Sequence, residues 1–400
     1  MTSANPQPDA VPGEVIVNVF GRTDVGRVRD HNEDAFLVAD LTADNASLQP
    51  EVRKHLLGSH GSLFMVADGL GGAAAGEVAS ELAILTVQSE LRAQWRSAPE
   101  RNADVFARAL KSAAEAANAK IFAYAVEHPE SRGLGTTATI AGLLGDTLYL
   151  AQVGDSRAYL VRNGVALQIT KDQSLMQRLI EAGELTPEEA ERSERRNIIL
   201  QALGPEPTVK IDLTYQKVRK GDTLVLCTDG LSGLVRKDEI AEILQESNGD
   251  LLTACRELID RANENGGPDN ITVIVARFEG EGLTSPDDEE SVGHAPFPLP
   301  GAQTPTTPRQ RYVDGPTAPF RRRNTEAVPA PPEPAPVDES VPVAAPRPMS
   351  AKGRSFLFLV AGVLLVIAAL LVYRIVKTGV IHSKQPEPTH PAAADSGIRA

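Results

Sequence analysis

Cysteine is scarce in this chain, which limits the kinds of site that it can carry. Two of the 400 residues are cysteines, Cys227 and Cys255, and they form no Cys-x-x-Cys pair and have no histidine close by. The sequence therefore predicts neither a zinc site nor a disulfide framework. Thiols that are not needed for cross-links indicate a reducing cytoplasm.

Basic residues are also fewer than acidic residues. The formal net charge is −13, with 40 Lys and Arg residues against 53 Asp and Glu residues. A nucleic-acid-binding protein needs an electropositive face for the phosphate backbone, so that class of function is disfavoured. An acidic balance instead suits a protein that gathers divalent cations.

The two flanks of the chain lack folded-domain signals. Residues 1–13 contain no apolar run, which predicts a flexible N-terminus and no secretory signal peptide. Residues 281–352 are rich in Pro, Ala, Thr, Glu and Arg and poor in aromatic residues. That composition predicts a disordered linker.

An uncharged run follows the linker at residues 356–373. As a helix it would rise about 27 Å, close to the thickness of a hydrocarbon core. We expect a transmembrane helix at 353–376 and a short tail at 377–400; a buried core helix is the alternative, but it would have no partner elements. The flanking Lys and Arg residues are balanced, so the missing signal peptide is what places the preceding domain in the cytoplasm.

Residues 14–280 form the expected folded domain. Strands are predicted at 14–20, 35–40, 62–68, 137–144, 147–153, 158–162, 165–170, 209–213, 223–227 and 271–278. Helices are predicted at 76–95, 103–127, 237–246 and 251–263, with a helical insertion at 173–193. Strands joined by hairpin turns, with helices in separate blocks, predict an α+β fold in which helices cover the faces of antiparallel sheets.

Acidic residues stand where predicted strands meet turns. The four clusters are Asn32-Glu33-Asp34, Asp68-Gly69, Asp229-Gly230 and Asp269-Asn270. Each cluster alone is more typical of a turn. Several carboxylates gathered at the ends of apolar strands are costly to desolvate unless a cation neutralises them. An all-oxygen ligand set favours Mg²⁺ or Mn²⁺ over zinc.

Six motifs follow one another between about residues 14 and 278. In order they are Arg29-x-x-x-Glu33-Asp34, Asp68-Gly69-x-Gly71-Gly72, Gly135-Thr136-Thr137, Gly154-Asp155-Ser156-Arg157, Cys227-Thr228-Asp229-Gly230 and Gly267-Pro268-Asp269-Asn270-Ile271-Thr272. Together they resemble the metal-dependent protein phosphatase (PPM) family, the type 2C class, in its bacterial branch. The resemblance implies a central antiparallel β-sandwich flanked by helices, with a binuclear Mn²⁺ or Mg²⁺ centre at one end.

The resemblance also implies roles for single residues. The implied metal ligands are Asp34, Asp68, the backbone carbonyl of Gly69, Asp229 and Asp269. Asp68 would bridge the two ions, and Asp34 would act directly or through water, with Glu33 nearby. Arg29 would bind the substrate phosphate, for which its planar fork of donors is suited. Asn270 is a further candidate.

Two positions depart from the family pattern. Leu70 stands where the eukaryotic branch has a histidine proposed to protonate the leaving group, so no general acid is assigned and a metal-bound water is the alternative. Glu130 stands where bacterial relatives use an aspartate for a third, weaker ion, with Asp229 as its partner.

Three other features have simpler interpretations. Asp155 is interpreted as a turn residue paired with Arg157, with metal ligation as the alternative. Residues 41–61 are interpreted as a surface loop with solvated His55 and His60. Residues 173–203 resemble the flap that stands beside the site in this family.

The sequence therefore predicts an enzyme, a protein serine/threonine phosphatase that opposes serine/threonine kinases. It would hydrolyse phosphoserine and phosphothreonine by attack of a metal-activated water. The expected partners are phosphorylated proteins, such as the kinases and their substrates, and the membrane. The alternatives are a catalytically inactive, membrane-tethered PPM-like regulatory or binding module and a small-molecule phosphatase.

Overall fold

The computed structural model describes residues 13–43, 53–71, 75–131, 133–287 and 291–299. The predicted linker beyond residue 299, the predicted membrane helix at 353–376 and the tail at 377–400 lie outside these described residues. Inside them, no helix is both long enough and apolar enough to cross a bilayer.

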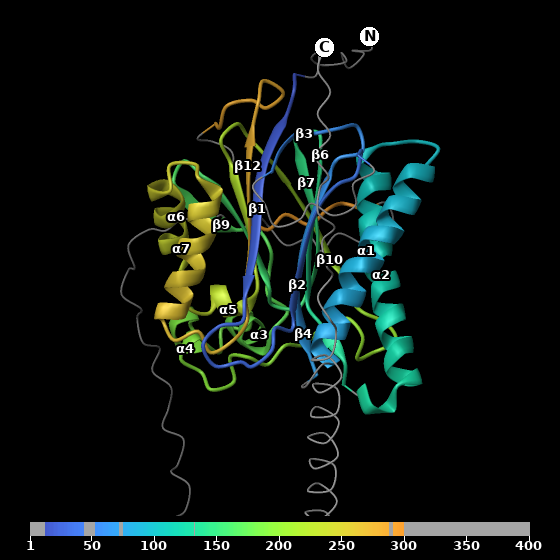
Figure 1. Cartoon of the computed structure of the whole chain (residues 1–400), viewed down its shortest axis with the longest axis vertical. Coiled ribbons are helices and arrows are strands. Elements are labelled where there is room, and N and C mark those ends of the chain that lie inside the picture. Colours follow the sequence, from blue (N-terminus) through green and yellow to red (C-terminus); the bar gives the residue numbers. More distant parts are fainter. Residues whose placement is uncertain (1–12, 44–52, 72–74, 132, 288–290, 300–400) are drawn as a thin grey trace, which may run out of the picture. The chain divides into compact units, whose positions relative to one another are not determined.

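Two antiparallel β-sheets form the centre of the domain (Figure 1). The first sheet has the strand order β3 (Arg53–Leu56), β1 (Ile16–Asp24), β12 (Ile271–Glu279), β11 (Thr223–Cys227), β8 (Arg157–Arg162) and β9 (Val165–Gln168). The second has the order β10 (Asp212–Lys217), β7 (Thr147–Val153), β6 (Ala138–Leu144), β4 (Ser62–Leu70) and β2 (Asp34–Asp40), with β5 (Gly135–Thr136) paired to β4. The expected antiparallel sandwich is confirmed.

Helices cover the outer faces of both sheets, as the α+β prediction required (Figure 1). α1 (Ala75–Ser97) and α2 (Ala103–Glu127) pack on the second sheet, and α6 (Lys237–Glu246) and α7 (Leu251–Glu264) pack on the first. The short helices are η1 (Pro129–Ser131), α3 (Leu175–Glu181), α4 (Pro187–Glu191) and α5 (Asp229–Ser232).

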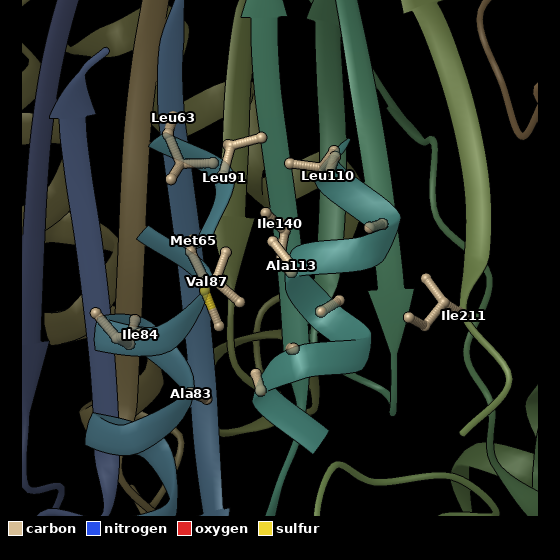
Figure 2. Close-up of a cluster of buried hydrophobic side chains, with 14 of the residues drawn as sticks. Leu63, Met65, Ala83, Ile84, Val87, Leu91, Leu110, Ala113, Ile140 and Ile211 are labelled. Carbon is tan, nitrogen blue, oxygen red and sulfur yellow. The ribbon is translucent and has the colours of Figure 1, made fainter. Parts of the chain in front are cut away.

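Side-chain alternation along β4 explains how the layers are held together. Leu63 and Met65 pack against α1 and α2 (Figure 2). Phe64 and Val66 point to the opposite face, because successive strand residues alternate, and the Phe64 ring meets Phe278 edge-on at 6.5 Å between centroids. All five side chains are fully buried, and burial of one such side chain contributes about 1.5 to 3 kcal/mol.

One predicted loop contains a strand. β3 lies inside 41–61 and pairs with β1, so the surface-loop interpretation is wrong for Arg53–Leu56. The sequence there has no apolar alternation, and the strand forms because the edge of β1 offers hydrogen bonds. His55 is half-buried with Nε2 2.9 Å from Ser62 Oγ, so it is not a solvated histidine.

The predicted helical insertion at 173–193 consists of two short helices rather than one. Gly183 follows α3 with a φ of 72°, the left-handed conformation that ends a helix. α4 then begins with a capping box between Thr186 and Glu189. The strand predicted at 209–213 begins at Asp212 instead.

Residues 291–299, which we call the strap, lie along the edge strand β10. The Tyr215 amide donates to the Ala295 carbonyl at 3.0 Å, and the Phe297 amide donates to the Leu213 carbonyl at 2.9 Å. The strap therefore continues the hydrogen-bonding pattern of the second sheet by one irregular segment.

The Phe297 ring holds the strap in place. It packs edge-to-face on Tyr149 and Tyr215, with ring centroids 5.6 and 5.7 Å away. The described fold thus continues past residue 280, where the linker was expected to begin. The Pro-rich composition of this region gives no sign that Phe297 packs against aromatic residues of the domain.

Candidate functional site

Asp34 and Asp68 lie opposite each other on neighbouring strands. Their Cα atoms are register partners in the β2–β4 pair. Residues directly opposite in a sheet present their side chains on one face, so the two carboxyl groups are adjacent.

Asp229 and Asp269 reach the same end of the sandwich from the first sheet. Asp229 opens α5 just after β11, and Asp269 comes two residues before β12. The carboxylates of Asp229 and Asp269 both act on the titration of Asp34, which places all three groups near one another. The structure therefore brings together the four predicted carboxylates, which are far apart in sequence.

Burial and repulsion between neighbouring carboxylates disfavour the charged form of these side chains. Burial raises the pKa of Asp68 well above its usual range, and four neighbouring carboxylates raise it further. Burial raises the pKa of Asp34 to about 7, although hydrogen bonds from Thr272 and Thr228 lower it. Burial and then Asp269 raise the pKa of Asp229. A cation would relieve this cost.

Two carboxylate oxygens in this group are buried and have no hydrogen-bond donor, Asp34 Oδ1 and Asp229 Oδ1. Such atoms suit a hard divalent cation. Across the described ranges, no group of three or more Asp, Glu, His or Cys side chains is arranged so that it could hold a metal ion by itself. The residues fit ions that are each held by one or two carboxylates, with backbone carbonyls and water completing the coordination, as Mg²⁺ prefers.

Two threonines donate hydrogen bonds to the other carboxylate oxygen of Asp34. The sequence motifs alone assigned no role to them. Thr228 Oγ1 donates to Asp34 Oδ2 at 2.8 Å, and Thr272 Oγ1 donates to it at 2.7 Å. Both threonines belong to motifs that the sequence displays, directly before Asp229 and at the start of β12. Their place in the same motifs as Asp229 and Asp269 was the available signal.

Gly69 lies where two backbones approach closely. Its amide donates to the Glu33 carbonyl at 3.1 Å, and a Cβ on Gly69 would collide with the carbonyl oxygen of Gly76 in α1. Only glycine fits there. Glu33 packs on this backbone junction, with its carboxyl group beside Gly76.

Arg29 is half-exposed and already has a carboxylate partner. Its Nη2 donates to Asp269 Oδ2 at 2.8 Å, with 49% and 30% of the two side chains exposed. The predicted phosphate-binding arginine and a predicted metal ligand are therefore neighbours.

Asn270 fixes the loop that carries Arg29. Its Nδ2 donates to the carbonyls of Val25 and His31 at 3.0 and 2.9 Å. Its Oδ1 accepts from the Glu33 amide at 2.8 Å. Asn270 thus contacts the loop backbone at three points, and these bonds occupy its side chain.

The predicted pairing of Asp155 with Arg157 is wrong. Arg157 instead binds Asp172 through two donors, Nε at 2.9 Å and Nη2 at 2.7 Å from Oδ2. Asp155 is 9% exposed, and burial, followed by repulsion from Asp229, raises its pKa to about 7. The turn Gly154-Asp155 therefore places a further carboxylate beside the other four.

Three further residues that the sequence singled out are Glu130, Leu70 and Cys227. The side chain of Glu130 lies outside the described part of the structure, so the third ion stays a prediction. Leu70 ends β4. Cys227 is fully buried, and burial raises its pKa to about 12, so its thiol is neutral and belongs to the core.

A helix-flanked antiparallel sandwich with acidic residues at the strand ends defines the class of metal-dependent phosphatase folds. The family model described as protein phosphatase 2C matches residues 45–266, which is more than half of the chain. The chain belongs to the protein phosphatase 2C family.

Individual relatives agree with this assignment. The serine/threonine phosphatase stp of Listeria monocytogenes is 37% identical over 255 residues, covering 64% of this chain and 93% of that protein. The solved serine/threonine phosphatase PstP/Ppp of Mycobacterium tuberculosis is 36% identical with a TM-score of 0.55, covering 66% of this chain and 99% of that one. A PstP catalytic domain in complex with 2 manganese ions is 35% identical with a TM-score of 0.53, covering 66% and 99%.

Proposed function

We propose that the chain is a metal-dependent protein serine/threonine phosphatase that hydrolyses phosphoserine and phosphothreonine. One observation carries this conclusion: acidic side chains from both sheets meet at one end of the sandwich, with buried oxygens of Asp34 and Asp229 left without donors. The named activity of relatives such as stp and PstP supports it. The proposed partners are phosphorylated proteins, among them serine/threonine kinases and their substrates.

The proposed ligands of two divalent ions are Asp34, Asp68, the carbonyl of Gly69, Asp229 and Asp269. Mn²⁺ or Mg²⁺ held there would supply the charge that activates a water and stabilises the phosphoryl transition state. Manganese in the similar PstP structure supports this choice of ion. Thr228 and Thr272 both donate to Asp34 Oδ2, which leaves the buried Oδ1 for a metal ion.

Arg29 is proposed to bind the substrate phosphate. Its exposed guanidinium contacts Asp269 through Nη2 alone. The other donors can therefore receive phosphate oxygens in a charge-assisted, bidentate contact. Asn270 holds the loop in place while Arg29 changes partner.

Hydrolysis by the full chain tests the proposal. We expect release of phosphate from phosphothreonine and phosphoserine peptides with Mn²⁺ or Mg²⁺, little release from phosphotyrosine peptides, and none in excess chelator. Undiminished turnover in chelator would refute the metal-dependent mechanism.

The proposed chain organisation adds a membrane anchor at residues 353–376, with the phosphatase domain on the cytoplasmic side. The uncharged run 356–373 supports this arrangement. Fractionation of cells that express the full chain tests it, because an anchored chain stays with membranes at high salt and alkaline pH. Extracellular protease should then trim the tail and spare the domain, whereas release by alkaline washing would count against the anchor.

A further inference from the structure

Thr23 and Thr272 lie opposite each other on neighbouring strands. They are register partners in the antiparallel pair of β1 and β12, which belong to the first sheet (Figure 1). Residues directly opposite in a sheet present their side chains on one face. The two Oγ1 atoms are 2.7 Å apart, which is hydrogen-bond distance. The threonine that donates to Asp34 is therefore itself bonded to a second hydroxyl group.

The hydrogen bond between these two hydroxyls has one possible direction. A hydroxyl group has a single proton to donate and can accept two further bonds. Thr272 Oγ1 donates its proton to Asp34 Oδ2 at 2.7 Å, so it can only accept from Thr23. Thr23 Oγ1 therefore donates to Thr272, and its lone pairs are left for another donor.

Asn32 supplies that donor and closes a circuit of hydrogen bonds. Its Nδ2 donates to Thr23 Oγ1 at 2.8 Å. Its Oδ1 accepts from the backbone amide of Asp34 at 3.1 Å, the pattern of an Asx turn. Four hydrogen bonds thus start at the Asp34 amide, pass through Asn32, Thr23 and Thr272, and return to the Asp34 carboxylate. We call this arrangement the Asp34 circuit.

The Asp34 circuit connects the two sheets at the end of the sandwich where the carboxylates meet. Thr23 and Thr272 belong to the first sheet, and Asp34 begins β2 in the second. Thr228, at the end of β11, donates to the same Oδ2 atom at 2.8 Å. All of these side-chain donors reach one oxygen, while Asp34 Oδ1 is buried and has no donor. The orientation of the Asp34 carboxylate is therefore fixed relative to the first sheet.

We propose that Thr23 and Asn32 are positioning residues for the metal centre, which hold Asp34 through Thr272 so that its buried Oδ1 is kept for a divalent ion. This inference rests on the proposed function, since it requires the ions. Hydrogen bonds in a chain polarise one another, so loss of an outer member weakens the inner bond to the carboxylate. Loss of a residue that orients a metal ligand typically changes metal affinity or activity by about 10- to 100-fold.

Calorimetric titration of the metal-free full chain with Mn²⁺ measures the effect of the circuit without an activity assay. In Thr23→Val, which keeps the side-chain shape and loses the hydroxyl, Mn²⁺ affinity should fall about 10- to 100-fold. Thr23→Ser keeps the hydroxyl and should restore the wild-type affinity. Asn32→Ala should also weaken Mn²⁺ binding, because both of its bonds in the circuit are lost.

A double-mutant cycle shows whether Thr23 and Asn32 act as one unit. Losses at independent sites add in free energy, whereas members of one hydrogen-bond network do not. The variant that combines Thr23→Val with Asn32→Ala should therefore bind Mn²⁺ about as weakly as the weaker single variant. A merely structural role would lower the metal-free melting temperature and leave the Mn²⁺ affinity of the folded protein at the wild-type level.

Hydrolysis of a phosphothreonine peptide provides a second readout. In Thr23→Val we expect kcat to fall with little change in KM, because the proposed phosphate contact of Arg29 is untouched.

Asn18→Ala is the matched control. Asn18 lies on the same strand, and its Nδ2 donates to Glu279 Oε2 at 3.3 Å across the same pair of strands. Glu279 ends β12, whereas Thr272 lies near its beginning. Loss of this cross-strand bond should leave both Mn²⁺ affinity and kcat unchanged.

Three results would overturn the inference: wild-type Mn²⁺ affinity in folded Thr23→Val and Asn32→Ala, fully multiplied losses in the double variant, or a loss in Thr23→Ser as large as in Thr23→Val. Asn32→Ala and Thr23→Ser decide the matter if Thr23→Val folds poorly. A wild type that neither binds Mn²⁺ nor hydrolyses phosphopeptides would remove the proposed function as well. A wild type that does both, with unaffected variants, would remove only the role of the circuit.

Discussion

Single carboxylates at this site are placed for binding rather than for stability. Asp229 shows the conflict clearly, because burial and Asp269 both disfavour its charged form. In Asp229→Asn we expect phosphopeptide hydrolysis to fall to background. The metal-free variant should nevertheless melt at a higher temperature than the metal-free wild type, and Mn²⁺ should raise the melting temperature of the wild type alone. Thermal melts with and without chelator check this, and a metal-free variant less stable than the wild type would contradict it.

Asp34 gives a prediction for pH. Its folded pKa of about 7 lies above the ordinary value of 3.8 that applies to the unfolded chain. Between these values the folded state binds more protons, so metal-free stability should fall as the pH rises from about 4 to 7, by up to about 1.4 kcal/mol per pH unit. Urea titrations in chelator measure the slope. Asp34→Asn should make the slope shallower, with Asp155 still titrating in the same window, and an equally steep slope in that variant would assign the effect to other groups.

Arg29 gives a prediction for substrate binding. Arg29→Ala should lower kcat/KM for phosphopeptides about 10- to 150-fold, the range for a lost hydrogen bond to a charged group. Mn²⁺ affinity should change less, because Arg29 is no ligand. Arg27→Ala is the control, since Arg27 is another exposed arginine of the same loop. Equal kcat/KM losses in both variants would remove the specific role of Arg29.

At the scale of the elements, the strap is the folded segment that the amino-acid composition indicated least. A row of edge-to-face aromatic pairs runs from Trp95 through Phe106 and Tyr149 to Phe297, with centroids 5.0 to 5.6 Å apart. Phe297→Ala should cost about 1 to 2 kcal/mol of unfolding free energy, because the ring is only partly buried. Hydrogen exchange at the Tyr215 amide should speed up in parallel.

His294→Ala is the comparison for the strap. It removes only the contact between His294 Nε2 and Asp212 Oδ2 at 2.7 Å, between two partly exposed side chains. Such surface pairs contribute about 0 to 1 kcal/mol. A loss in His294→Ala as large as in Phe297→Ala would mean that the ring does not anchor the strap.

Elements with a strong local pattern could be predicted from the sequence, and elements that depend on a partner could not. Short runs of apolar and β-branched residues identified β4 and β6, and helical periodicity identified α1 and α2. β3 was missed because its sequence has no such pattern and only the edge of β1 makes it a strand.

The candidate site shows the same division. Strand-end motifs predicted the four carboxylates, because local sequence fixes their place on each strand. The pairing of Arg157 with Asp172, across fifteen residues and a hairpin, follows from how β8, β9 and the flap fold back on one another. No spacing rule specifies such a partner.

At the scale of the whole chain, the domain should work without the residues that follow the strap. A chain cut after residue 299 keeps the Phe297 contacts and all the site residues, so its kcat/KM for soluble phosphopeptides should match that of the full chain. If residues 353–376 anchor the chain as proposed, the action of the fragment on membrane-bound substrates should be weaker, because an anchor raises the effective concentration of such substrates. A cut after residue 280 removes the strap and should lower the melting temperature. Lower peptide activity in the longer fragment would show that later residues contribute to catalysis.

The position of the strap determines which strand a pull on the C-terminal side of the chain would reach first. β12 leads away from Asp269, and a chain continuing straight from Glu279 would transmit any pull to the strand next to that residue. Residues 291–299 instead run back antiparallel along β10, with Ala295 beside Tyr215 and Phe297 beside Leu213. If the proposed anchor at residues 353–376 holds the chain to a membrane, a pull from the C-terminal side would therefore act first as shear on the edge strand β10 and would reach the strand next to Asp269 only afterwards.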